Sequence, residues 1–107
     1  MQIQYLEIVT GKVDETCVAL ASLTAASFSA PNPLFGNVRI ADPSGGGRMC
    51  VRALMRPDEA PVVRPYMRVD SIEKAAAAIE AAGGTFAMTA TDMPGEGKFA
   101  IYLLGGI

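Results

Sequence analysis

The chain has 107 residues, of which 50% are hydrophobic and 19% are charged, and its formal net charge is −2. This length suits a single domain with one core, and the composition excludes a disordered tail. Because there is no basic excess, we expect no binding to nucleic acid. The N-terminus shows no signal peptide, and polar residues and prolines interrupt the longest uncharged stretch, residues 16–38. The expectation is a cytoplasmic protein that does not associate with membranes.

The absence of histidine removes several kinds of chemistry. Without an imidazole there is no Ser-His-Asp or Cys-His pair and no histidine metal ligand. The two cysteines, Cys17 and Cys50, lie far apart and have no CxxC spacing, so we expect buried, inert thiols rather than a zinc or redox site. No catalytic residue and no cofactor are assigned from these counts.

The first half of the chain predicts a strand, a helix and then several strands. Residues 3–9 alternate, with Leu6 and Ile8 on one face and Tyr5 and Glu7 on the other. A helix is predicted to begin at Asp14 and to end near Ala25. The later predictions are an irregular or edge strand at residues 28–34, strands at 37–41 and 48–54 around a glycine turn at 44–47, and an exposed connector at 56–61.

The second half repeats this order. Residues 62–69 are predicted to form a strand, and Asp70 with Glu73 has the form of a capping box at the start of an alanine-rich helix. Gly83 and Gly84 are expected to end that helix. Residues 85–89 and 98–104 are predicted strands, joined by a turn at 93–97.

The two halves can be aligned as a repeat. Residues 5–9 align with 64–68, and residues 36–40 align with 97–101, so that Gly45 corresponds to Gly106. In the first copy a strand follows Gly45, but only one residue follows Gly106. We therefore expect a missing final strand in the second copy. Either the natural chain continues beyond Ile107, or another element or chain covers the open sheet edge.

The segments YLEIVTGKVDET, NVRIADPSGGGRMCVRALM, VVRPYMRVDSIEKAAAAIEAAGG and FAIYLLGGI, in this order, resemble the glyoxalase/bleomycin-resistance group of the vicinal oxygen chelate superfamily. The resemblance covers nearly the whole chain. It implies one α+β domain of two tandem βαβββ modules, at about residues 1–56 and 62–107. Their curled mixed sheets would surround a cleft, usually within a homodimer.

The resemblance also allows the metal ligands to be compared. Metal-using relatives place a histidine early in each module's first strand and a glutamate in each module's last strand. Here the first-strand positions fall on Tyr5 and Arg64, and the first module's last strand offers Cys50, Val51 and Arg52. An arginine at such a site would repel a cation. The sequence therefore predicts no metal site, and neither glyoxalase nor dioxygenase activity.

A cleft-facing set of side chains follows if Leu6, Ile8, Met67 and Val69 pack against the helices. The alternation of a strand then points another set into the cleft. Arginines and tyrosines offer forked donors and flat aromatic surfaces, so we expect a small anionic or aromatic ligand. The predicted ligand-binding residues are Tyr5, Glu7, Arg52, Arg64, Tyr66 and Arg68.

Several interpretations stay open at this point. Arg64 and Arg68 could form a solvated face with Glu7 as a surface ion pair and no function. The tyrosines could serve packing only. The leading hypothesis is a metal-independent small-molecule-binding protein that sequesters or senses its ligand. One alternative is a lyase-like or isomerase-like enzyme that uses Glu7 or Tyr66, with arginines stabilising an oxyanion. The other is a structural or partner-binding module whose cleft is filled by side chains.

Overall fold

The computed structural model describes residues 2–43, 45–93 and 97–107. The fold is α+β, as the sequence predicts. The described residues form two α-helices and two separate sheets. The chain forms two compact units, Met1–Arg68 and Val69–Ile107, which are described one at a time. Within the described ranges, no helix is long and apolar enough to cross a membrane.

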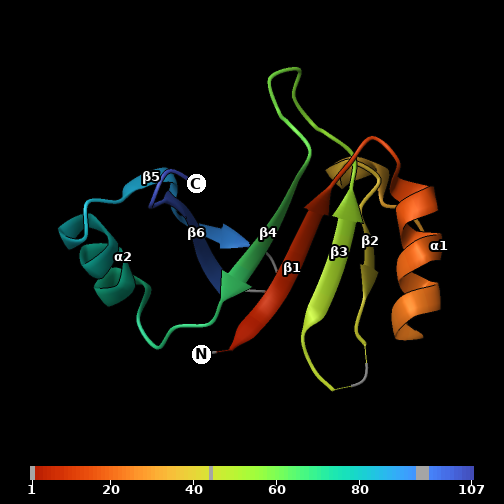
Figure 1. The fold of residues 1–107 in the computed structure, drawn as a ribbon, viewed down its shortest axis with the longest axis horizontal. Helices are drawn as coiled ribbons and strands as arrows, with labels where there is room; N and C mark the ends of the chain where they lie inside the picture. The colour runs from red at the N-terminus through yellow and green to blue at the C-terminus, as the bar shows by residue number, and fades with distance from the viewer. Residues whose placement is uncertain (1, 44, 94–96) are drawn as a thin grey trace. The chain divides into compact units, whose positions relative to one another are not determined.

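The first unit is built on a four-stranded mixed sheet with the order β2-β3-β1-β4 (Figure 1). Its central strand, β1, pairs in parallel with β3 and antiparallel with β4, and β2 pairs antiparallel with β3. The strands are β1 (Ile3–Val9), β2 (Arg39–Ala41), β3 (Arg48–Arg52) and β4 (Val62–Met67). Strand β4, which belongs to the second predicted module, thus pairs with β1 inside the first unit. The module limits of 1–56 and 62–107 remain a prediction.

Helix α1 (Val13–Thr24) packs against β3 and ends at Ala25 in the left-handed conformation. It begins one residue earlier than predicted, because Lys12 and not Asp14 is the N-cap residue. Asp14 instead lies in the first turn and accepts a hydrogen bond from Arg39 Nη1 at 3.1 Å. A carboxylate is also favourable in that turn, where the helix dipole is positive.

The segment predicted as an irregular or edge strand at residues 28–34 forms no strand. It makes one isolated bridge, between Asn32 and Val38, and then a short 3-10 helix, η1 (Pro33–Phe35). The Asn32 side chain accepts from the Leu34 amide at 3.1 Å and caps this turn. Proline cannot donate to a strand ladder but suits the first position of a helical turn, which explains the difference.

The core of the first unit lies between α1 and one face of the sheet. Cys17, Ala41 and Val51 lie there with 2% or less of their surface exposed. Val9 and Cys50, which belong to the opposite face of the sheet, are buried to the same degree. Both cysteines are free thiols, so the expectation of buried thiols is confirmed.

Strand β4 is less well covered on the helix side than predicted. Met67 and Val69 were expected to pack against the helices, but their surfaces are 42% and 49% exposed. The strand also ends at Met67, two residues earlier than predicted. Helix α1 packs on β3, and β4 lies beyond β1 at the edge of the sheet, which accounts for the exposure of Met67.

The second unit consists of helix α2 (Ile72–Ala81) and the hairpin of β5 (Thr85–Met93) and β6 (Gly97–Leu103). Ser71, rather than Asp70, caps the helix by accepting from the Lys74 amide at 3.2 Å. Gly83 follows the helix with a φ of +89°, as predicted for a glycine stop. The turn predicted at 93–97 and the glycine turn at 44–47 lie partly outside the described residues.

Candidate functional site

The strand register places the predicted site residues of β1 and β4 on one face of the sheet. Tyr5 lies opposite Tyr66, and Glu7 lies opposite Arg64. On the other side of β1, Glu7 is the partner of Cys50. Since directly paired residues project to the same side of a sheet, these side chains share the face opposite α1.

Glu7 is the centre of a hydrogen-bonded cluster on this face. Its Oε2 accepts from Arg52 Nε at 3.0 Å, and its Oε1 accepts from Arg64 Nη1 at 2.6 Å and from the Tyr66 hydroxyl at 3.1 Å. Arg52 also donates through its Nη1 and Nη2 to Glu59, at 2.9 and 2.7 Å. We refer to Glu7, Arg52, Glu59, Arg64 and Tyr66 as the Glu7 network.

The charged groups of the Glu7 network are mostly covered. The Glu7, Arg52 and Glu59 side chains are 12%, 13% and 9% exposed. Arg64 is more open, at 28%. Charges removed from water must be paired and hydrogen-bonded, and the network pairs two carboxylates with two guanidinium groups. The interpretation of Glu7 as one partner of a solvated surface ion pair is therefore wrong.

Arg52 has a positioning role in this arrangement. Its donors are directed to Glu7, to Glu59 and to the backbone oxygen of Ala53. These hydrogen bonds use four of its five N–H groups, which leaves little of this guanidinium for a ligand. Arg52 thus orients Glu7 and holds the segment between β3 and β4 against the sheet.

Glu59 is the member of the network that sequence reasoning missed. It lies in the segment predicted as an exposed connector, yet its Oε1 accepts from the Met55 amide at 2.7 Å as well as from Arg52. The hydrogen bonds from Arg52 lower the pKa of Glu59 to about 2. No local pattern distinguishes Glu59 from Asp58, which is an exposed partner of Arg56.

The two tyrosines form an aromatic pair beside Glu7. The ring centroids of Tyr5 and Tyr66 lie 5.5 Å apart with an interplanar angle of 80°, an edge-to-face arrangement. Burial raises the pKa of Tyr66 to about 12 and also raises the pKa of Tyr5. Both phenols are therefore neutral at physiological pH. Burial likewise raises the pKa of the Cys50 thiol, which lies on the same face.

Arg68 is predicted to belong to this face but lies outside the Glu7 network. It comes after the last residue of β4, and its backbone amide donates to the Gln2 oxygen at 2.9 Å. Its surface is exposed. The structure thus brings together five of the six predicted residues, namely Tyr5, Glu7, Arg52, Arg64 and Tyr66.

The residues of this face do not fit a divalent metal ion, which the family resemblance would otherwise imply. Both carboxylate oxygens of Glu7 already accept hydrogen bonds from guanidinium groups. In the described part of the chain, no three cysteine, aspartate or glutamate side chains come together to hold an ion. A cation placed beside Glu7 would also meet the positive charges of Arg52 and Arg64.

Comparisons with known proteins give little beyond this geometry. No protein-family model matches the chain, and no curated protein sequence matches it. Among solved structures, the crystal structure of TioX from Micromonospora sp. ML1 aligns with 99% of this chain and 92% of its own, at 18% identity and a TM-score of 0.37. We draw no conclusion about fold or function from a likeness at this score.

Proposed function

We propose that the chain is a metal-independent small-molecule-binding protein of the glyoxalase/bleomycin-resistance type. In this proposal the chain has the modular βαβββ organisation of that type, and the Glu7 face lines its ligand site. The observation that carries the proposal is the convergence of Arg64, Tyr66 and Glu7 beside an aromatic pair, at a partly exposed end of the network. Ligand sites commonly combine aromatic surface with a few converging polar groups.

The charge balance of the network narrows the class of ligand. Arg52 and Arg64 are already neutralised by Glu59 and Glu7. An added anionic group would meet the Glu7 carboxylate without any surplus positive charge to compensate. Of the two expected classes, anionic and aromatic, we therefore favour a neutral aromatic ligand. Its ring would lie against Tyr66, and a carbonyl or hydroxyl group would accept from Arg64.

The enzyme alternative has less support. A general base needs a free lone pair directed at the substrate, but the Glu7 carboxylate accepts three side-chain hydrogen bonds. The structural alternative is favoured by one observation, because the network satisfies its own polar groups without a ligand. The ligand experiment separates this alternative from the proposal.

The experiment is a thermal-shift titration with benzamide, a neutral aromatic probe, and with benzoate, its anionic counterpart. Binding to the native state raises the unfolding midpoint, and the rise continues as the ligand concentration exceeds the dissociation constant. We expect benzamide to raise the midpoint of the wild type and to have a smaller effect on Arg64→Gln. The matched control is Arg68→Gln, just past the end of the same strand, which should respond as the wild type does. If benzamide has no effect, or affects all three proteins alike, the structural alternative is supported.

The proposed homodimer and the cytoplasmic location depend on the family resemblance and on the sequence. Light scattering of the full chain at several concentrations tests the dimer. A mass that stays monomeric throughout contradicts this part of the proposal.

A further inference from the structure

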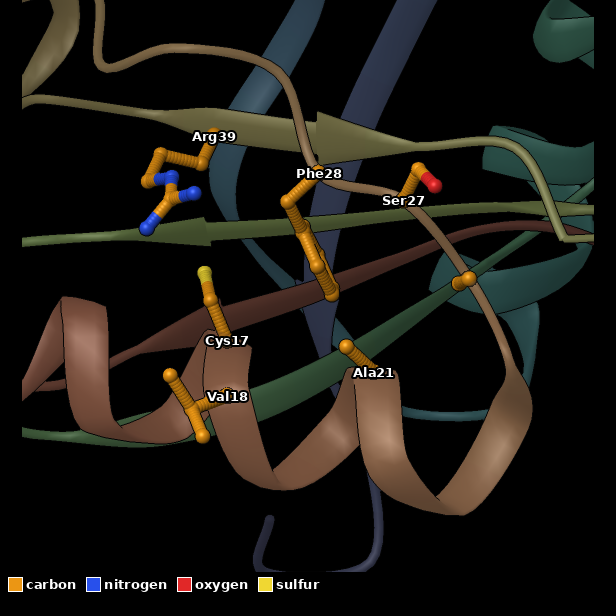
Figure 2. Close-up of a pocket in the computed structure, with 7 residues that line it drawn as sticks. Cys17, Val18, Ala21, Ser27, Phe28 and Arg39 are labelled. Carbon is orange, nitrogen blue, oxygen red and sulfur yellow. The ribbon is translucent and has the colours of Figure 1, made fainter.

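A hollow lies on the opposite face of the sheet from the Glu7 network. It has a volume of about 330 Å³ and lies between α1 and the segment that follows the helix (Figure 2). All of its lining residues belong to the first unit. Those that the argument uses are Cys17, Val18, Ala21, Phe28 and Arg39.

Arg39 provides the one charged group of this lining. Its Nε donates to the Ser29 oxygen at 2.9 Å, and its Nη1 donates to Asp14 Oδ1 at 3.1 Å. The Asp14 side chain is 81% exposed, whereas the Arg39 side chain is only 23% exposed. An ion pair with one such exposed partner contributes little to stability. A carboxylate from a ligand can therefore replace Asp14 on Arg39 at little cost.

The rest of the hollow is largely apolar. Figure 2 shows the Phe28 ring directed toward Ala21, and the Cys17 sulfur on the side of Arg39. Burial raises the pKa of the Cys17 thiol, so that the thiol stays neutral and is a poor nucleophile. The chemistry of this lining therefore suits reversible binding.

We propose that this hollow binds small organic monocarboxylates with an apolar body. The carboxylate would replace Asp14 on Arg39, and the apolar body would lie against Phe28 and Ala21. A guanidinium group matches a carboxylate in charge and in hydrogen-bond geometry. The site is separate from the Glu7 face, so this proposal does not depend on the proposed function.

The test is a titration of the full, isotope-labelled chain with phenylacetate, followed by amide chemical shifts in NMR spectra. We expect saturable shifts at Cys17, Ala21 and Phe28, with a dissociation constant on the order of 1 mM. Asp14→Asn removes the competing carboxylate and should tighten binding about threefold, and Arg39→Gln should weaken it about tenfold. Phenylacetamide, the neutral counterpart, should bind more weakly and should not respond to Asp14→Asn.

Two further variants keep the test decisive if Arg39→Gln does not fold. Ala21→Met fills the hollow from the helix and leaves Arg39 in place, so it should weaken phenylacetate binding. Ser22→Met adds the same side chain at the neighbouring exposed position and should have no effect. The proposal is overturned if no saturable shifts occur at these residues. It is also overturned if Ala21→Met and Ser22→Met bind phenylacetate equally well.

Discussion

Arg52 binds Glu59 through both of its Nη nitrogens, at 2.9 and 2.7 Å, while its Nε donates to Glu7. One guanidinium group thus connects the central strand of the sheet to a segment that the sequence predicts to be an exposed connector. Parallel hydrogen bonds of this kind are strong and fix the orientation of both partners. The Arg52–Glu59 pair therefore holds the segment that contains Glu59 close to Glu7.

Removing this pair should destabilise the first unit. Arg52→Gln leaves Glu59 covered without its cation and leaves Glu7 with Arg64 alone. We expect a loss of about 2 kcal/mol in the free energy of unfolding, below the range for deeply buried pairs because these side chains keep about a tenth of their surface exposed. Urea unfolding measures the loss. The control is Arg56→Gln, whose pair with Asp58 is exposed and should contribute less than about 0.5 kcal/mol. Equal losses in the two variants would show that the Arg52 pair has no special role.

The Arg52–Glu59 pair should make the free energy of unfolding depend on pH in the acidic range. Arg52 holds the pKa of Glu59 at about 2 in the folded chain, below its ordinary value of 4.5. A lowered folded-state pKa contributes stability that is complete above about pH 4.5 and is lost as the pH falls to about 2. The difference in unfolding free energy between the wild type and Glu59→Gln should therefore shrink across this range. A difference that stays constant from pH 6 to pH 2 would contradict the pairing.

Tyr66 should make the free energy of unfolding depend on pH in the alkaline range. Burial raises its pKa from 10.0 to about 12, so the folded chain holds the phenol proton more tightly than the unfolded chain does. Stability linked to this group is complete below about pH 10 and is lost as the pH rises to about 12. In an ultraviolet titration, the phenolate signal that Tyr66→Phe removes should have its midpoint near pH 12. A midpoint near 10 would mean that the ring is not buried.

How much of this face could be predicted from the sequence depends on the residue. Glu7, Arg64 and Tyr66 lie in alternating strands, and alternation determines which side chains share a face. Glu59 could not be found in this way, because no local spacing indicates that a polar segment folds back onto the sheet. The sequence places Arg68 on this face because it predicts a strand that continues to residue 69. Strand β4 instead ends at Met67.

The local structure around Gly36 is also only partly predictable from the sequence. The prolines of residues 28–34 indicate that a regular strand is unfavourable there, but they do not specify the 3-10 turn that forms instead. Nor does the sequence show that the Gly36 oxygen accepts from the Ala53 amide at 2.8 Å. This contact joins segments that are close only in the folded chain.

Gly36 should therefore be sensitive to substitution. Its φ is +61°, and an added Cβ would lie 2.9 Å from the Ala53 oxygen. We expect Gly36→Ala to lower the free energy of unfolding by about 2–3 kcal/mol, from backbone strain together with steric overlap. Gly47→Ala is the control, because Gly47 also has a positive φ but its nearest neighbour would lie 3.8 Å away. If both variants lose the same amount, the close approach at Gly36 is not important.

The central claim is that the Glu7 face binds an organic ligand without a metal ion. The most direct test is to measure nuclear Overhauser contacts between benzamide and the full chain in the presence of EDTA. We predict contacts from the benzamide ring to the rings of Tyr5 and Tyr66, and their loss in Arg64→Gln but not in Arg68→Gln. Contacts that avoid both tyrosines, or that arise only after Zn²⁺ is added, would contradict the claim.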